Sequence, residues 1–230
     1  MKNVIKGLVL LSSIVSSINI AYADWIQPLI GVDYEWSKMR GSNSWRSILP
    51  KSYTGGDIYI GAQFSEYVGV ELGYQSTTKK TRKHAFKAQD QFFDISVPAD
   101  STSKVNVRFH GWYFDLLGYL PFDNCFGLIG TVGYGVIRPK VVGMDSIAFL
   151  NTLGGGSIHG RTVGGFRLGA GGQYMLTDFV GIRALARWKN TAHLKFKSNS
   201  TFAPIAQQFR ISRRLFKDTG SLLVGIFVKF

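Results

Sequence analysis

Apolar and polar side chains alternate along most of this chain with a period of two, which is the pattern of β-strands. Eight segments show this alternation, and none shows a sustained helical period of about 3.6 residues. The predicted strands cover residues 26–36, 55–64, 67–76, 105–118, 125–137, 161–175, 179–189 and 220–230. The pattern therefore predicts an all-β protein.

The connections between these strands are short and long in turn. Those at 65–66, 119–124 and 176–178 are typical of tight turns, whereas the polar segments at 37–54, 77–104, 138–160 and 190–219 are typical of long loops. Because short and long connections alternate, every long loop lies at the same end of an up-and-down antiparallel sheet.

The two faces of the predicted strands differ in charge. Even-numbered positions form an apolar face that carries almost no charge, and odd-numbered positions hold the charged residues and many glycines. The charged positions are Asp33, Glu35, Asp57, Glu71, Asp115, Arg167, Arg183, Arg187 and Lys229. Acids fall on the first four strands and bases on the last three, so closing the sheet brings opposite charges face to face. We expect these groups to pair, with the glycines leaving room for the long arginines.

Aromatic residues at both ends of the apolar face indicate which way it points. Near the predicted long loops lie Trp36, Tyr74, Trp112, Tyr134, Phe166 and Trp188; near the tight turns lie Phe64, Phe126, Tyr174 and Phe230. Two aromatic belts that flank an apolar band are typical of a protein surface crossing both interfaces of a bilayer. The sequence therefore predicts an eight-stranded antiparallel up-and-down transmembrane β-barrel. A soluble barrel of the lipocalin type, with its apolar face inside, is the alternative.

The N-terminus resembles a secretory signal peptide. Lys2 and Lys6 precede an apolar stretch at 7–20, and Ala-Tyr-Ala at 21–23 is a small-residue cleavage site. We predict a signal peptide at 1–23 and a barrel domain at 24–230; a short N-terminal membrane anchor is the alternative. The single cysteine, Cys125, excludes a disulfide framework or a cysteine-based zinc site.

Three stretches resemble the transmembrane domain of outer membrane protein A and its small barrel relatives: EYVGVELGY at 66–74, LGYLP at 117–121, and GGQYMLTD at 171–178 with the strand to Trp188. The resemblance implies a monomer in the outer membrane of a Gram-negative bacterium, with its long loops extracellular. In that family a luminal glutamate and arginine form an ion pair implicated in pore gating, and the matching residues are Glu71 and Arg183. The family's further lysine and glutamate fall at Leu116 or Asp115 and at Leu185, so the remaining network must differ.

The last predicted strand places apolar residues at every second position and an aromatic residue at the terminus. These residues are Leu222, Val224, Ile226, Val228 and Phe230. They resemble the sorting signal read by the outer-membrane assembly machinery. An ordinary amphipathic strand is the alternative.

The net charge of the chain is +13, and most of the basic residues lie in the predicted loops. This charge indicates which partners the loops attract. Basic clusters include Lys79, Lys80, Arg82 and Lys83 in the second loop and Arg213 and Arg214 in the last. Such clusters attract polyanions, and at a cell surface these are lipopolysaccharide phosphates and acidic host glycans. Nucleic acid is not an expected partner of a secreted barrel. The alternative is that these charges are only solvated.

No motif in the sequence predicts catalysis, a metal site or a cofactor. The histidines His84, His110, His159 and His193 lie in loops or at strand ends, without the His-x-Ser-Asn stretch of lipid A deacylases. The glycines at 154–156 lack the Lys-Ser/Thr of a phosphate-binding loop. We therefore predict a structural or small-pore barrel with a charge-paired lumen. The alternatives are an adhesin that binds acidic glycans through basic loops, and a lipid A-modifying enzyme.

Overall fold

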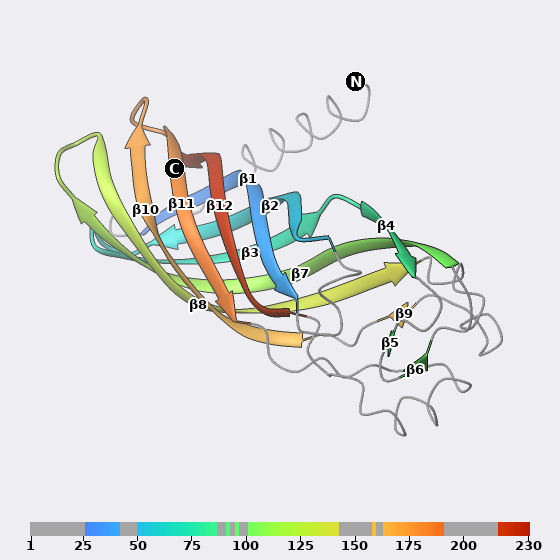
Figure 1. Ribbon diagram of the computed structural model, residues 1–230. Coiled ribbons are helices and arrows are strands. Elements are labelled where there is room, and N and C mark those ends of the chain that lie inside the picture. Colours follow the sequence, from blue (N-terminus) through green and yellow to red (C-terminus); the bar gives the residue numbers. More distant parts are fainter. Residues whose placement is uncertain are drawn as a thin grey trace.

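Eight long strands form a closed antiparallel barrel in the computed structural model, which describes residues 26–41, 50–86, 91–92, 95–96, 101–142, 158–159, 163–190 and 216–230 (Figure 1). The barrel strands are β1 (Gln27–Gly41), β2 (Ser52–Gln63), β3 (Val68–Thr77), β7 (Ser101–Pro121), β8 (Phe126–Val142), β10 (Val163–Met175), β11 (Val180–Asn190) and β12 (Phe216–Lys229). Within these described ranges, no helix has the length and apolar character needed to cross a membrane.

Each barrel strand pairs with its neighbours in chain order, and the first strand pairs with the last. The pairing of β1 with β12 runs from Leu29 opposite Lys229 to Gly41 opposite Phe216, and it closes the sheet. Figure 1 shows this closure, with β1 in blue beside β12 in red. The fold confirms the predicted eight-stranded antiparallel barrel.

The strands at the long-loop end extend further than the sequence pattern predicts. The described residues contain four additional strands: β4 (Lys80–Phe86), β5 (Gln91–Phe92), β6 (Ile95–Ser96) and β9 (Ile158–His159). β4 pairs with the first residues of β7, and together they form a ribbon beyond the barrel (Figure 1). The prediction of a long polar loop over 77–104 was therefore wrong for β4 and the start of β7, which are strands. Residues 80–84 and 101–104 are polar at every position, so alternation is lost there while backbone pairing continues.

The three short turns share one hydrogen-bond pattern. The second residue after each strand is Ser65, Asp123 or Thr177. Its side-chain oxygen accepts two backbone N–H groups at 2.5 to 3.3 Å. Serine, threonine and aspartate favour such turns because their side chains replace a backbone acceptor. The N–H groups of Phe126 and Cys125 also stabilise the Asp123 carboxylate and hold its pKa below the ordinary value.

Side chains at even-numbered barrel positions point outward, and most of them are large and apolar. Ile226 is 54% exposed, whereas the odd-numbered Glu71 is 1% exposed inside the barrel. The outward set includes Val32, Ile58, Ile60, Leu72, Leu168, Leu222 and Val224. An apolar exterior around a charged interior is stable only when hydrocarbon surrounds the barrel, because water would favour the reverse arrangement.

We expect Ile226→Arg to destabilise the barrel by about 2–4 kcal/mol in lipid vesicles, because this residue lies midway between the two aromatic belts. The matched substitution is Leu120→Arg, one residue before the end of β7 at the short-turn end of the barrel. It should cost about 0–1 kcal/mol, because a charge near the interface is less costly than one at the middle of the bilayer. Urea unfolding of the refolded variants, followed by tryptophan fluorescence, measures both. Equal costs at the two positions would contradict a hydrocarbon-facing surface.

Candidate functional site

The barrel interior holds the charged residues, and their two signs nearly balance. Five carboxylates and four cations are buried within the described part of the chain. They are Asp33, Glu35, Asp57, Glu71, Asp115, Arg167, Arg183, Arg187 and Lys189. Lys229 is only partly buried and donates a hydrogen bond to Gln63 at 2.8 Å. With Lys229 included, the described interior contains equal numbers of acidic and basic groups.

Arg183 on β11 forms two of the shortest ion pairs in the described interior. Its Nη2 and Nε atoms lie 2.6 and 3.0 Å from the two carboxylate oxygens of Asp33 on β1. Its Nη1 lies 2.6 Å from Oε2 of Glu71 on β3. The Tyr113 hydroxyl donates a further hydrogen bond of 2.9 Å to Oε1 of Glu71. The guanidinium group therefore bridges two carboxylates across the lumen, an arrangement we call the Arg183 bridge.

Two tyrosine rings support the arginines, and glycines make room for the rings. Arg183 stacks on the Tyr59 ring with 3.7 Å between its Cζ atom and the ring centroid. Tyr59 is directly opposite Gly31 in the register, and a Cβ at Gly31 would overlap the ring. In the same way Tyr113 lies over Gly73, and Arg167 stacks on it at 3.5 Å. These two glycines thus accommodate aromatic rings, and the arginines pack on the rings.

A second charged cluster is paired more loosely than the Arg183 bridge. Arg187 lies 3.1 Å from Asp57 and 3.5 Å from Asp115, and Arg167 lies 3.2 Å from Asp115. Several polar atoms of these four residues are buried without a protein hydrogen bond, including both carboxylate oxygens of Asp115. The strength of these pairs is therefore Coulombic, with little of the hydrogen bonding that holds the Arg183 bridge.

A third cluster contains residues that the sequence analysis missed. Lys189 Nζ lies 2.6 Å from Glu35 and 3.0 Å from Gln75, and Ser37 donates a hydrogen bond of 2.9 Å to Glu35. Gln75 also accepts a hydrogen bond of 3.4 Å from Arg167. Lys189 and Gln75 occupy odd positions on strands that were predicted, so parity alone could have identified both as luminal.

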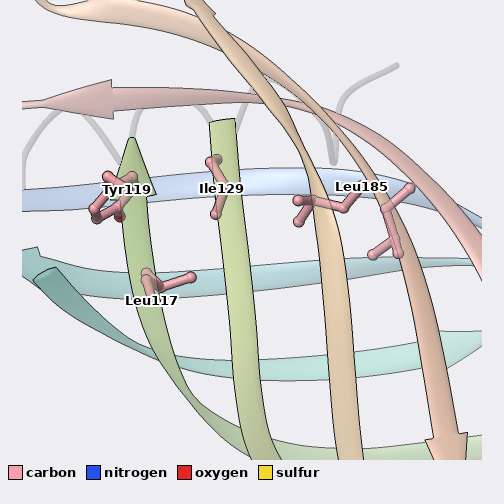
Figure 2. Close-up of a cluster of buried hydrophobic side chains, with 5 residues drawn as sticks. Leu117, Tyr119, Ile129 and Leu185 are labelled. Atoms are coloured by element: carbon pink, nitrogen blue, oxygen red, sulfur yellow. The ribbon is translucent and has the colours of Figure 1, made fainter. Parts of the chain in front are cut away.

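Apolar side chains fill the interior beside the charged clusters. Figure 2 shows Leu117 and Tyr119 on β7, Ile129 on β8 and Leu185 on β11; Leu223 completes this buried cluster. Leu185 thus stands in an apolar environment where the resembled family has a charged residue. Two positions, Asp115 and Leu116, correspond to the family's luminal lysine in the sequence. Asp115 points inward, whereas Leu116 is 45% exposed on the outer face.

An aromatic pair lies at the long-loop mouth of the barrel. The Tyr53 and Phe109 rings pack edge to face with centroids 5.1 Å apart, and both side chains are buried. Val107 is buried on the same face of β7 as Phe109. Aromatic packing therefore fills part of the described interior near its mouth, and charge pairing fills the part further in.

The predicted aromatic belt lies on the outer face at the long-loop end. Tyr74 is partly exposed, and the others are 42% to 65% exposed: Trp36, Trp112, Tyr134, Phe166 and Trp188. On the last strand, Leu222, Val224, Ile226 and Val228 point outward, and Phe230 follows the strand end. The function of these residues as a membrane belt and a sorting signal stays a prediction.

The four basic residues of the second predicted loop lie on different faces of the ribbon. The register shifts by one residue between Ser76, opposite His110, and Lys80, opposite the buried Val107. This extra residue places Lys80 and Arg82 on the inner face, and Lys83 on the outer face. Lys79 is exposed between β3 and β4.

Several predicted residues cannot be placed. The signal peptide at 1–23, the glycines at 154–156, His193, Arg213 and Arg214 lie outside the described residues. The side chains of His84 and His159 are likewise not described. Within the described ranges, no group of three or more His, Cys, Asp or Glu side chains is arranged to hold a metal ion.

Two solved structures share this architecture at low sequence identity. Ail, the attachment invasion locus protein of Yersinia pestis in complex with the heparin analogue sucrose octasulfate, is 16% identical with a TM-score of 0.50; the match covers 89% of this chain and 99% of Ail. Neisserial surface protein A is 16% identical with a TM-score of 0.52, covering 88% of this chain and 97% of that protein. At this identity the likeness supports the fold alone.

No curated protein sequence matches this chain. A family model described as "Outer membrane protein beta-barrel domain" matches residues 7–208, which is most of the sequence. With its closed barrel and apolar outer band, this chain is an integral β-barrel protein of a Gram-negative outer membrane, and it belongs to the outer membrane protein beta-barrel domain family.

Proposed function

We propose that this protein is a closed outer-membrane barrel whose charge-paired lumen admits small solutes only when the Arg183 bridge opens. The observation that carries the proposal is the contact of one guanidinium group on β11 with both Asp33 on β1 and Glu71 on β3. In the ring of eight strands, β3 lies directly across from β11. A barrel of eight strands has an interior just wide enough for side chains to fill, so one bridge spans it.

Each charge of the Arg183 bridge depends on its partners for its stability. Removing one partner of a buried ion pair leaves a desolvated charge and costs about 3–5 kcal/mol. The bridge therefore stabilises the closed barrel, and opening it requires both carboxylates to find other partners or water. Arg167 and Arg187 of the looser cluster supply such partners, because each has guanidinium nitrogens without a hydrogen bond.

For the structural role, we expect Arg183→Met to destabilise the barrel by about 3–5 kcal/mol, because Asp33 and Glu71 would lose their shared cation. Adding Asp33→Asn and Glu71→Gln to this variant should recover most of the loss, because both buried negative charges are removed. Urea unfolding in lipid vesicles measures all of these variants. A triple variant as unstable as Arg183→Met would show that charge balance is not what the bridge contributes.

For the pore role, we expect Arg183→Ala to raise single-channel conductance in planar bilayers, because the bridge no longer spans the lumen. Leu185→Ala is the matched control, since it removes luminal volume without removing charge. Adding Tyr53→Ala to Arg183→Ala should raise conductance further, because it opens the aromatic mouth. Unchanged conductance in Arg183→Ala would reject the gate, and an equal rise in Leu185→Ala would assign closure to volume.

The second candidate function is binding of acidic glycans, favoured by the basic ribbon that β4 and β7 form beyond the barrel. Lys79 and Lys83 are exposed there, and Lys80 and Arg82 are partly exposed. The similar fold of Ail was solved with a sulfated sugar analogue, which gives the chemical class of ligand to test. Phosphate or sulfate groups would be bound with strong salt dependence.

For this candidate, the test variant replaces all four basic residues with glutamine: Lys79→Gln, Lys80→Gln, Arg82→Gln and Lys83→Gln. We expect it to elute from immobilised heparin at a lower salt concentration than the parent protein, because four positive charges are lost. The control variant Arg40→Gln/Lys51→Gln removes exposed bases from β1 and the start of β2. Retention that is unchanged in the ribbon variant, or equally reduced in the control, would reject the ribbon as the glycan site.

We also propose that the barrel has no catalytic function. His110 is the one histidine side chain in the described ranges, and the charged groups acting on it are the cations Arg108, Arg138 and Lys140. A hydrolytic histidine needs an acid to orient it, whereas the charged groups that act on His110 are all cations.

We further propose that the protein is a monomer and that the assembly machinery recognises its last strand, from Leu222 to Phe230.

A further inference from the structure

Four basic or titratable side chains face each other in two rows on the outside of β7 and β8. Arg108 is directly opposite Lys140, and His110 is directly opposite Arg138. Arg108, Arg138 and Lys140 are exposed, and His110 is partly exposed. We call these four residues the basic ladder. Their even-numbered positions place them on the same outward face as the apolar band.

The ladder begins where the aromatic belt ends. The next row down pairs Trp112 with Val136, and the row below that pairs Phe114 with Tyr134. Tyr74 connects the two regions, with its ring centroid 4.9 Å from Trp112 and 6.5 Å from His110. Successive rows on one face are about 7 Å apart along a strand. Because belt aromatics lie at the membrane interface, the ladder lies at the level of the lipid headgroups.

Like charges placed directly opposite each other in a sheet are destabilising, and Arg108 and Lys140 are placed in this way. In the part of the chain that the structure describes, Arg108, Arg138 and Lys140 form no ion pair with an acid; Arg108 donates a hydrogen bond to the Ser76 hydroxyl at 3.1 Å. The charges acting on His110 are all positive.

The other side of the barrel differs at a similar height. On β1 and β12 the corresponding outward pair is Arg40 opposite Asp218, in which a base faces an acid. The repulsion is therefore a local property of β7 and β8. A concentration of unopposed bases at headgroup level is complementary to anionic lipid.

We propose that the basic ladder binds the phosphate groups of lipopolysaccharide in the surrounding outer leaflet. The phosphates bridge Arg108 with Lys140 and offset the repulsion among Arg108, Arg138 and Lys140, while the acyl chains lie against Trp112 and Phe114. Arginine and lysine supply charged donors for phosphate oxygens. This site lies on the outer surface and is independent of the luminal gate and of the ribbon beyond the barrel.

The test uses the purified barrel in dodecylmaltoside micelles and titrates bisphosphorylated lipid A, with binding followed by quenching of tryptophan fluorescence. The variant Arg108→Gln/Arg138→Gln/Lys140→Gln should bind lipid A roughly 100-fold more weakly, because each base near an anionic lipid surface contributes about a fivefold factor in affinity. Without lipid A, its thermal unfolding midpoint should equal or exceed that of the parent protein, because the opposed charges are gone.

Three controls distinguish a lipid phosphate site from general attraction. Lys38→Gln/Arg40→Gln/Lys51→Gln removes three exposed bases from β1 and from the residue before β2, and should keep parental affinity. Lipid A stripped of its phosphates, and inorganic phosphate alone, should bind the parent protein weakly. Unchanged affinity in the ladder variant, equal weakening in the control variant, or tight binding of either control ligand would overturn the proposal. A ladder variant whose unfolding midpoint falls below that of the parent would show that the cations are held by the protein itself.

Discussion

Backbone hydrogen bonding in hydrocarbon is the constraint on which this structure depends. Lipid offers no donors or acceptors, so a spanning sheet must pair every strand with two neighbours. The register between β1 and β12 meets this requirement by joining the first strand to the last. Closure with eight strands leaves an interior that only side chains can fill. Because the apolar side chains face lipid, the polar ones have to fill the interior.

A charged interior is stable only where its groups are paired and supported. The Arg183 bridge achieves this with two carboxylates and an aromatic ring, and the ring needs a glycine opposite it. Arg167 repeats the arrangement on Tyr113 and Gly73 but pairs less closely with its acid. The lumen thus combines a layer of short, hydrogen-bonded ion pairs around Arg183 with a looser layer around Arg187.

The outer surface changes character abruptly at the aromatic belt. Below Trp112 the outward side chains are apolar, and above it β7 and β8 present Arg108, Arg138 and Lys140. Pairing of the backbone continues across this boundary, and only the character of the side chains changes. The same continuity carries β4 and β7 beyond the barrel as a ribbon.

The sequence by itself determined the strands, their antiparallel order and the face of each side chain. A strand in a bilayer must separate apolar from polar residues with a period of two, so parity alone was enough to place Glu71 and Arg183 inside the barrel. The same odd-numbered pattern places Lys189 and Gln75 inside the barrel, so both could have been predicted as luminal residues. What the tertiary structure decided is which groups meet. Strand register decides that Arg183 contacts Asp33 as well as Glu71. It also decides that the Tyr59 ring packs over Gly31, and that a one-residue shift turns Lys80 inward. Register arises from pairing between segments far apart in the chain, and a pattern read along one strand carries no information about the height of its neighbour.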